Sequence, residues 1–235
     1  MSELRVRGDV FGQRIREQYT EQLGRRLDLL VAGCAREHGL VLDRVETRIS
    51  GVDDDIEQVR AALERGTDVE SWSLGDLRSV PIPPRSFDVI FVHFLLERIH
   101  HTELVLDRML NGLRPGGLLL LRMRDRSSAY GFWDRITPSW LRRLAWPYLT
   151  GDDGAGPLPA VYEPVTSREG MLAFCLSRGL MVTDSETATS GPAMGRLGSA
   201  AVGLVSRMSR GRYTSAHDEV VMVIRKPQNH FARLI

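Results

Sequence analysis

Acidic side chains follow strand-like segments of this chain at spacings that suit the recognition of a nucleoside. Thr47 to Val52 is a strand-like run that ends at Asp53, and Asp53 lies 20 residues after Gly33. A carboxylate about that far along, at the end of a second strand, is placed to accept hydrogen bonds from two vicinal ribose hydroxyls. Asp53 and its neighbour Asp54 are therefore predicted to lie at a ribose.

The same acidic cluster also suits the start of a helix. A helix is expected over Ile56 to Arg65, and an acidic residue just before it can accept bonds from its first N–H groups. Asp54 or Asp55 is the expected cap. The two roles are compatible if Asp53 holds the ribose and a neighbour caps the helix.

Leu27 to Ala32 predicts a buried first strand that leads into Gly33 and Cys34. Glycine in such a turn lets a ligand approach the backbone, and a helix that begins there offers unpaired N–H groups. An apolar segment, Leu40 to Val45, follows the turn. A strand, a glycine turn and a helix are expected here, with Ala32, Gly33 and Cys34 against the ligand.

The stretch from Arg85 to Met123 organises the rest of the chain. Phe87 to Val92 and Leu118 to Met123 are short apolar runs that suit buried strands. Glu103 to Leu113 between them has apolar residues at helical spacing. A strand, a helix and a strand in this order form a crossover with parallel strands.

This stretch resembles the second half of the class I S-adenosylmethionine-dependent methyltransferases that act on small molecules. The resemblance rests on three groups of residues: Phe87-Asp88-Val89-Ile90, Leu96-Glu97-Arg98 where the family has "LEH", and Leu113-Arg114-Pro115-Gly116-Gly117. It implies a Rossmann-like α/β fold with a seven-stranded, mostly parallel sheet, helices on both faces and an insertion after the fifth strand. Residues 1–235 would form one domain, with its core at 25–125 and 164–227 and a lid-like insertion at 126–163.

The resemblance also implies S-adenosyl-L-methionine as the cofactor. Gly75-Asp76-Leu77 fits the family's pattern after the third strand, where the acid reaches the adenine amino group and the next residue packs near the ring. The alternative for Asp76 is a cap on a surface turn. Val92 and His93 would lie beside the methionine portion of the cofactor.

The first glycine-rich motif departs from the family pattern. Val31 stands where an acid is expected, and Ala35 and Glu37 replace the second and third glycines. Two hypotheses follow: methyl transfer from S-adenosylmethionine to a small-molecule acceptor, or an inactive methyltransferase-like partner or regulatory subunit. A side chain such as Glu37 that fills the cofactor cleft would favour the second. A dehydrogenase-type nucleotide domain explains Gly33 and Asp53 but leaves the later motifs unexplained.

A general base is needed if the acceptor is a hydroxyl. The candidates are His93, His100, His101 and Tyr162; for His93 the alternative is a structural hydrogen bond. Tyr162 belongs to the aromatic-rich insertion, which the resemblance implies can close over the acceptor. The histidines lack the spacing of metal ligands, so no metal site is predicted.

Composition narrows the classes of protein and the kinds of partner that remain possible. A net charge of +1, from 31 basic and 30 acidic side chains, gives no electrostatic case for nucleic acid as the main partner. Two cysteines without metal-ligand spacing, and no apolar run of about 18 residues, predict a cytoplasmic protein without an integral membrane segment. A homodimer or a protein partner is left open, as are the acceptor and the methylated atom.

The hydrophobic and capping patterns also predict the remaining helices and strands. Helices are expected at Asp9–Leu23, Ser139–Ala145 and Ser167–Arg178, and a mobile surface helix at Met194–Met208. Strands are expected at Asp68–Leu74, from Leu180 to Thr183 and at Glu219–Ile224, the last antiparallel by resemblance.

Overall fold

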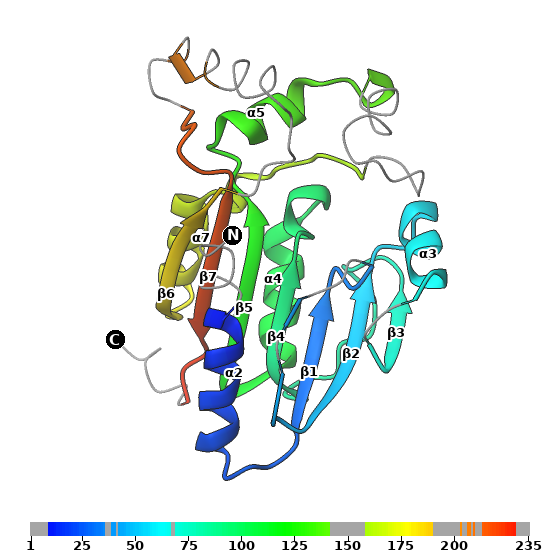
Figure 1. Cartoon of the computed structure of the whole chain (residues 1–235), viewed down its shortest axis with the longest axis vertical. Helices are drawn as coiled ribbons and strands as arrows, with labels where there is room; N and C mark the ends of the chain where they lie inside the picture. The colour runs from blue at the N-terminus through cyan, green and yellow to red at the C-terminus, as the bar shows by residue number, and fades with distance from the viewer. Residues whose placement is uncertain are drawn as a thin grey trace.

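Seven strands form one sheet in the computed structural model, which describes residues 9–35, 39–40, 42–66, 69–141, 158–189, 203, 206–207, 209 and 213–228 (Figure 1). The strands lie in the order β3-β2-β1-β4-β5-β7-β6. Their bounds are β1 (Leu27–Ala32), β2 (Thr47–Asp53), β3 (Ser71–Leu74), β4 (Phe87–His93), β5 (Leu113–Arg124), β6 (Met181–Ala188) and β7 (Glu219–Arg225).

The first five strands are parallel, and β7 runs antiparallel between β5 and β6. The predicted mostly parallel sheet is therefore confirmed. The register aligns Ala32 with Val52 on one side and with Val92 on the other. The carboxyl ends of β1, β2 and β4 consequently meet at one edge, where the strand order reverses and α/β sheets bind ligands.

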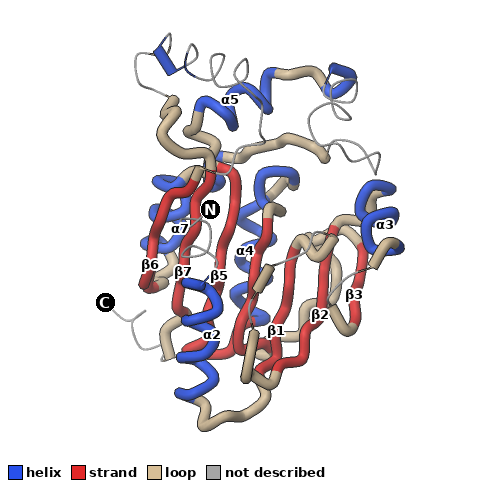
Figure 2. The backbone as a smooth tube through the Cα atoms, in the orientation of Figure 1, coloured by secondary structure: helices blue, strands red, loops and turns tan. Residues whose placement is uncertain are grey.

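Helices cover both faces of the sheet (Figure 2). Buried residues of α2 (Asp9–Glu21) and α3 (Glu57–Glu64) pack on one face, and those of α4 (Thr102–Gly112) and α7 (Arg168–Ser177) on the other. In Figure 1, α5 (Ala129–Ile136) lies beyond the carboxyl edge of the sheet. Two short 3₁₀ turns, η1 (Leu96–Arg98) and η2 (Pro164–Thr166), complete the described elements. None of the described helices is both long and apolar enough to cross a membrane.

Helix ends agree with the sequence in two places and disagree in one. Gly24 follows α2 with φ of 72°, and the hydroxyl of Ser167 accepts the N–H of Gly170 at the start of α7. The predicted acidic cap of α3 was wrong, because its N-cap is Ile56, which makes no side-chain bond. Asp55 instead pairs with Arg60 at 2.5 Å, since that guanidinium competes for the carboxylate.

The helix expected between β1 and β2 is absent from residues 39–40 and 42–46. Leu40, Leu42 and Val45 instead pack from a loop against the core cluster that lies beneath α2 and α3. Apolar residues were therefore a correct sign of burial, but too few lie between the strands to complete an amphipathic helix. Glu37 lies outside the described residues.

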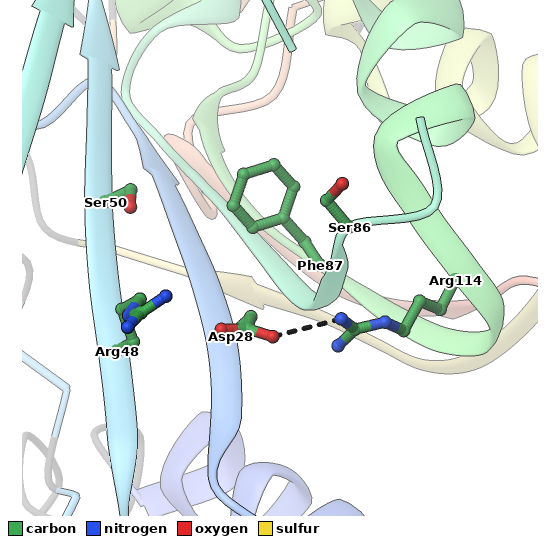
Figure 3. A pocket seen from close by; sticks show the side chains of 6 residues that line it. All are labelled: Asp28, Arg48, Ser50, Ser86, Phe87 and Arg114. Carbon is green, nitrogen blue, oxygen red and sulfur yellow. Dashed lines mark hydrogen bonds and ion pairs between the residues drawn. The ribbon is translucent and has the colours of Figure 1, made fainter. Parts of the chain in front are cut away.

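The family signature residues Asp88 and Arg114 form an ion pair at the opposite, amino-terminal edge of the sheet. The Asp88 side chain is fully buried and accepts from Arg114 at 2.5 Å, from Arg25 at 2.6 Å and from the N–H of Asp28 at 3.0 Å. Burial opposes its ionisation, but these donors hold the pKa of Asp88 below its usual value. Asp28 and Arg114 also border a hollow of about 290 Å³, far from the carboxyl edge (Figure 3).

Candidate functional site

The turn after β1 needs glycine. Gly33 has φ of 91°, and a Cβ on it would lie 2.2 Å from the carbonyl oxygen of His93. Its N–H donates to the carbonyl of Val52 at 2.9 Å, so the turn is held between the ends of β2 and β4. Ala32 and Cys34 beside it are buried, and burial raises the pKa of the Cys34 thiol to about 12. The turn is therefore where the sequence placed it, and its thiol stays protonated.

Asp53 ends β2 as predicted, but its carboxylate is enclosed. One oxygen accepts the N–H of Ala35 at 3.1 Å, and the other accepts the N–H of Asp54 at 2.8 Å and pairs with Arg98. The side chains of Asp53 and Arg98 are 0% and 4% exposed. A ribose cannot reach Asp53 in this arrangement.

Asp54 and Asp76 are the accessible carboxylates at this edge. Asp54 is half-buried, and burial raises its pKa to about 6. Asp76 is exposed and accepts both the N–H and the guanidinium of Arg78, which lowers its pKa to about 2. Asp76 thus makes the surface turn weighed as its alternative, although its exposed oxygens remain open to a ligand.

Leu77 and Val92 are core residues. Leu77 is 2% exposed and Val92 0%, and both belong to the cluster beneath α4 and α7. Their side chains therefore pack inside the protein, beneath the carboxyl edge of the sheet. His93 ends β4 in an aromatic column, with its ring centroid 5.2 Å from that of Phe91 and 4.8 Å from that of Phe94.

An aromatic–arginine cluster lies beside His93, formed by Phe94, Arg122, Arg124 and Tyr130. The two guanidinium groups lie 5.0 and 5.3 Å from the Phe94 ring centroid, and Arg124 lies 4.8 Å from that of Tyr130. Arg122 pairs with Glu219 at 3.1 Å, and Arg124 pairs with Asp218. Burial raises the pKa of Glu219. The sequence patterns did not single out this cluster, because its members come from the end of β4, from β5 and from α5 and meet only in the folded chain.

Tyr162 lies deep in the fold. It is 2% exposed, and its hydroxyl donates to Asp134 at 2.9 Å. Burial first, and then the neighbouring carboxylate of Asp134, raises the pKa of Tyr162 well above its usual value. A phenol that keeps its proton and already donates it is a hydrogen-bond donor rather than a general base at neutral pH.

The other two candidate bases are on the surface. His100 and His101 are exposed, and His101 adopts φ of 56° at the start of α4. The backbone N–H of His101 and of Thr102 donate to the Glu163 carboxylate at 2.7 and 2.9 Å. This turn therefore serves as a helix cap that joins the insertion to α4.

Reasoning from the sequence did not assign a site role to two further polar residues, Arg98 and Asp125. Arg98 stands where the family has the histidine of "LEH", and this difference from the family is the feature of the sequence that could have drawn attention to it. Asp125 follows β5 and contacts His217 at 2.9 Å, from segments 92 residues apart. Within the described ranges, no group of three or more His, Cys, Asp or Glu side chains could hold a metal ion.

The residues at this edge fit the nucleoside end of S-adenosylmethionine. Gly33 lets the turn after β1 lie directly against the end of β4, where a Cβ would clash with the carbonyl of His93, and Asp54 and Asp76 offer carboxylates at neighbouring strand ends. Carboxylate acceptors suit the hydroxyls of a ribose and the amino group of adenine, whereas Val31 supplies no acid for the methionine ammonium.

The strand order, the antiparallel β7 and a nucleoside-type edge at the switch point are those of the fold of class I S-adenosylmethionine-dependent methyltransferases. Residues 30–121 match the family model described as a methyltransferase domain.

Known proteins are similar to this chain in sequence or in fold. The chain is 32% identical over 134 residues to the trans-aconitate 2-methyltransferase of Azoarcus sp. (strain BH72), which covers 56% of this chain and 50% of that protein. The chain thus spans half the length of that curated relative. An S-adenosylmethionine-dependent methyltransferase from Mesorhizobium loti has a TM-score of 0.51 at 14% identity, covering 85% and 91% of the two chains.

A second similar structure comes from Haloferax volcanii, from the complex between the Trm112 methyltransferase activator and the putative methyltransferase. Its TM-score is 0.55 at 16% identity, with 95% of this chain and 94% of that chain covered. At these identities the two structures show that the fold is shared.

Proposed function

We propose that this protein transfers a methyl group from S-adenosylmethionine to a small-molecule acceptor. The observation that carries the proposal is that the segment just before η2 is bonded to η1, the turn that follows β4. The N–H groups of Val161 and Tyr162 both donate to the carbonyl of Glu97, at 2.8 and 3.0 Å. A segment held at this place would cover an acceptor at the end of β4 and shield it from water, which favours a small acceptor.

The acceptor would lie near the aromatic–arginine cluster. Phe94 is 8% exposed and stands at the carboxyl end of β4, and Arg122 and Arg124 lie over its ring. Guanidinium groups favour carboxylates through paired hydrogen bonds. The name of the Azoarcus relative points the same way, so organic acids are the acceptors to test first.

Within this proposal the protein supplies alignment and a dry environment. Bound S-adenosylmethionine supplies an electrophilic sulfonium methyl group, and displacement at that carbon needs the acceptor in line with it. Gly33, Asp54 and Asp76 would hold the nucleoside, and His93 would border the acceptor. For a carboxylate acceptor no general base is needed, whereas a hydroxyl acceptor would require one, and His93, whose ring centroid lies 4.8 Å from that of Phe94, is the candidate.

Calorimetric titration with S-adenosylmethionine and S-adenosylhomocysteine tests the cofactor, and transfer of a labelled methyl group to organic acids, phenols and amines tests the acceptor. We expect micromolar binding and transfer to an acid. A folded sample that binds neither compound at millimolar concentration would instead favour the hypothesis that the protein is an inactive methyltransferase-like partner or regulatory subunit. The cytoplasmic location remains a prediction from the sequence. A homodimer and a protein partner are left open by the sequence, and size measurement and pull-down with the same sample address them.

A further inference from the structure

We propose that Arg98 is a positioning residue of the cofactor site, which fixes Asp53 as an internal brace and leaves Asp54 to accept the ribose hydroxyls. The inference rests on the proposed use of S-adenosylmethionine and assigns roles within that same site.

Asp53 has no accessible oxygen for a ligand. Its two carboxylate oxygens serve the N–H of Ala35, the N–H of Asp54 and the guanidinium of Arg98, and its side chain is 0% exposed. A ribose diol needs two acceptor positions at a surface that it can reach. Asp53 therefore acts inside the protein, although its place in the sequence is that of a ribose ligand.

Arg98 and Asp53 depend on each other. Arg98 comes from η1 after β4 and is 5% exposed, and no other described carboxylate pairs with it. Removing one partner of a buried ion pair leaves the other charge without water or counter-charge, which is strongly unfavourable. The pair is consequently held in one arrangement.

This brace ties together the three elements that surround the first loop. Through Asp53, the N–H of Ala35 after β1 is joined to the end of β2 and to η1. Val31 stands where an acid could have organised this turn, and its apolar side chain cannot do so. Arg98 thus supports a loop whose own sequence lacks the usual determinants.

Asp54 is the carboxylate left for the ligand. It is half-buried, and no hydrogen bond or ion pair within the described residues reaches its side-chain oxygens. Burial raises its pKa, and Arg98, Asp53 and Asp76 also act on it electrostatically. A desolvated carboxylate without an internal donor suits an external one, such as a pair of hydroxyls.

The test measures affinity for S-adenosylhomocysteine by calorimetry and Tm near neutral pH, in the full chain. The variants are Asp54→Ala, Asp53→Asn, Arg98→Met, Arg98→Lys and the double variant Asp53→Asn/Arg98→Met. Asp55→Asn is the matched control, because Asp55 is a neighbouring carboxylate whose partner is the exposed Arg60.

We expect Asp54→Ala to weaken binding at least about tenfold without lowering Tm, and Asp55→Asn to leave affinity unchanged. Asp53→Asn and Arg98→Met should each lower Tm by roughly 10 °C and weaken binding. The double variant should recover most of the Tm but not the affinity, whereas Arg98→Lys should recover part of the affinity. A merely structural pair would return affinity together with Tm.

Three results would overturn the inference while the proposed function stands. The first is Asp54→Ala binding S-adenosylhomocysteine as tightly as the unmodified chain. The second is a loss of affinity in Asp53→Asn at unchanged Tm, which would make Asp53 the ligand of the ribose, and the third is tighter binding by Arg98→Met, which would mean that Arg98 blocks the site. If the unmodified, folded chain binds no S-adenosylhomocysteine, the proposed function itself fails, and the assignment of Asp54 fails with it.

Discussion

Single residues at the carboxyl edge differ in what burial does to them. Asp53 is buried with three donors, Asp54 is half-buried without one, and Tyr162 is buried as a donor to Asp134. The same chemical group therefore serves as a brace at one position and as a candidate ligand at the next. This difference can be measured, because burial without a partner raises the pKa of a carboxyl group.

Asp54→Asn should raise Tm near neutral pH. The pKa of Asp54 is raised from 3.8 to about 6 in the folded protein, where it faces Arg98, Asp53 and Asp76. The folded state thus binds the proton more tightly, so its stability falls as pH rises through about 4 to 6 and stays lower above that range. Asparagine does not titrate. Thermal melts across pH should show equal Tm near pH 4 and a gain for the variant at neutral pH; an equal Tm at both would contradict the shift.

Tyr162→Phe should retain methyl transfer within about tenfold, because removal of a true general base costs about 10²–10⁴-fold. The loss of one hydrogen bond to Asp134 should lower the free energy of unfolding by about 1 kcal/mol. Initial rates with saturating acceptor and a urea titration check the two numbers. A loss of transfer greater than a hundredfold, in a folded variant, would restore Tyr162 as a base.

At the scale of elements, one carboxylate joins the insertion to the core. Glu163 accepts the first N–H groups of α4, which the helix itself cannot satisfy. The adjacent residues Val161 and Tyr162 bond to η1. The segment at Val161 to Glu163 is thus fixed to the same helix–turn unit that carries Arg98.

Glu163→Gln should lower the free energy of unfolding by about 1 kcal/mol at neutral pH. Burial opposes the charge of Glu163, but the N–H groups of Thr102 and His101 outweigh it and lower its pKa from 4.5. The stabilisation is therefore present above about pH 4.5 and is lost as pH falls through the lower, folded-state pKa. Urea titrations at several pH values measure this, with Glu169→Gln in the first turn of α7 as the control. Equal losses in the two variants would contradict a specific cap.

At the scale of the whole molecule, motif residues that carry the resemblance to the methyltransferases stabilise the fold at the edge opposite the candidate site. Asp88 joins the segment after α2, the start of β1 and the start of β5 through Arg25, Asp28 and Arg114. These residues therefore hold the sheet together, and the candidate site lies at the other end of the same strands.

Asp88→Asn should lower the free energy of unfolding by about 3 kcal/mol, because two guanidinium groups lose a buried counter-charge. Asp28→Asn should cost less, since Asp28 is 28% exposed and makes one ion pair with Arg114. Denaturant titration gives both values. The affinity of folded Asp88→Asn for S-adenosylhomocysteine should be unchanged; a large loss would show that the two edges are coupled.

Apolar runs were sufficient to predict most of the sheet. Strand β4 was expected from Phe87 to Val92 and ends one residue later, and β7 was expected from Glu219 to Ile224 and ends at Arg225. Buried strands in a parallel sheet are apolar on both faces, so sequence reveals them directly. Strand β5 begins at Leu113 rather than Leu118, because Arg114-Pro115-Gly116-Gly117 lies within the strand instead of forming a separate turn.

Elements without a regular apolar pattern were predicted less well. Helix α5 was not foreseen, and the helix expected after β1 is absent from the described part of that connection. The helix expected at Ser139–Ala145 is helical at 139–141 and then leaves the described residues, as does most of Met194–Met208. Short or polar segments take their conformation from the surfaces they contact, and those surfaces are not visible in the local sequence.

The sequence alone predicted most of the strands and where they end, because buried strands are apolar runs, and it indicated the class of fold through the resemblance. It also predicted that ligands bind at the carboxyl edge of the sheet. Only the tertiary structure decided which carboxylate is enclosed and which is open. Asp53 and Asp54 are neighbours of identical chemistry, and their roles differ because Arg98, 45 residues away from Asp53, reaches one of them. The sequence shows that a side chain is charged, but the fold determines which partner neutralises that charge.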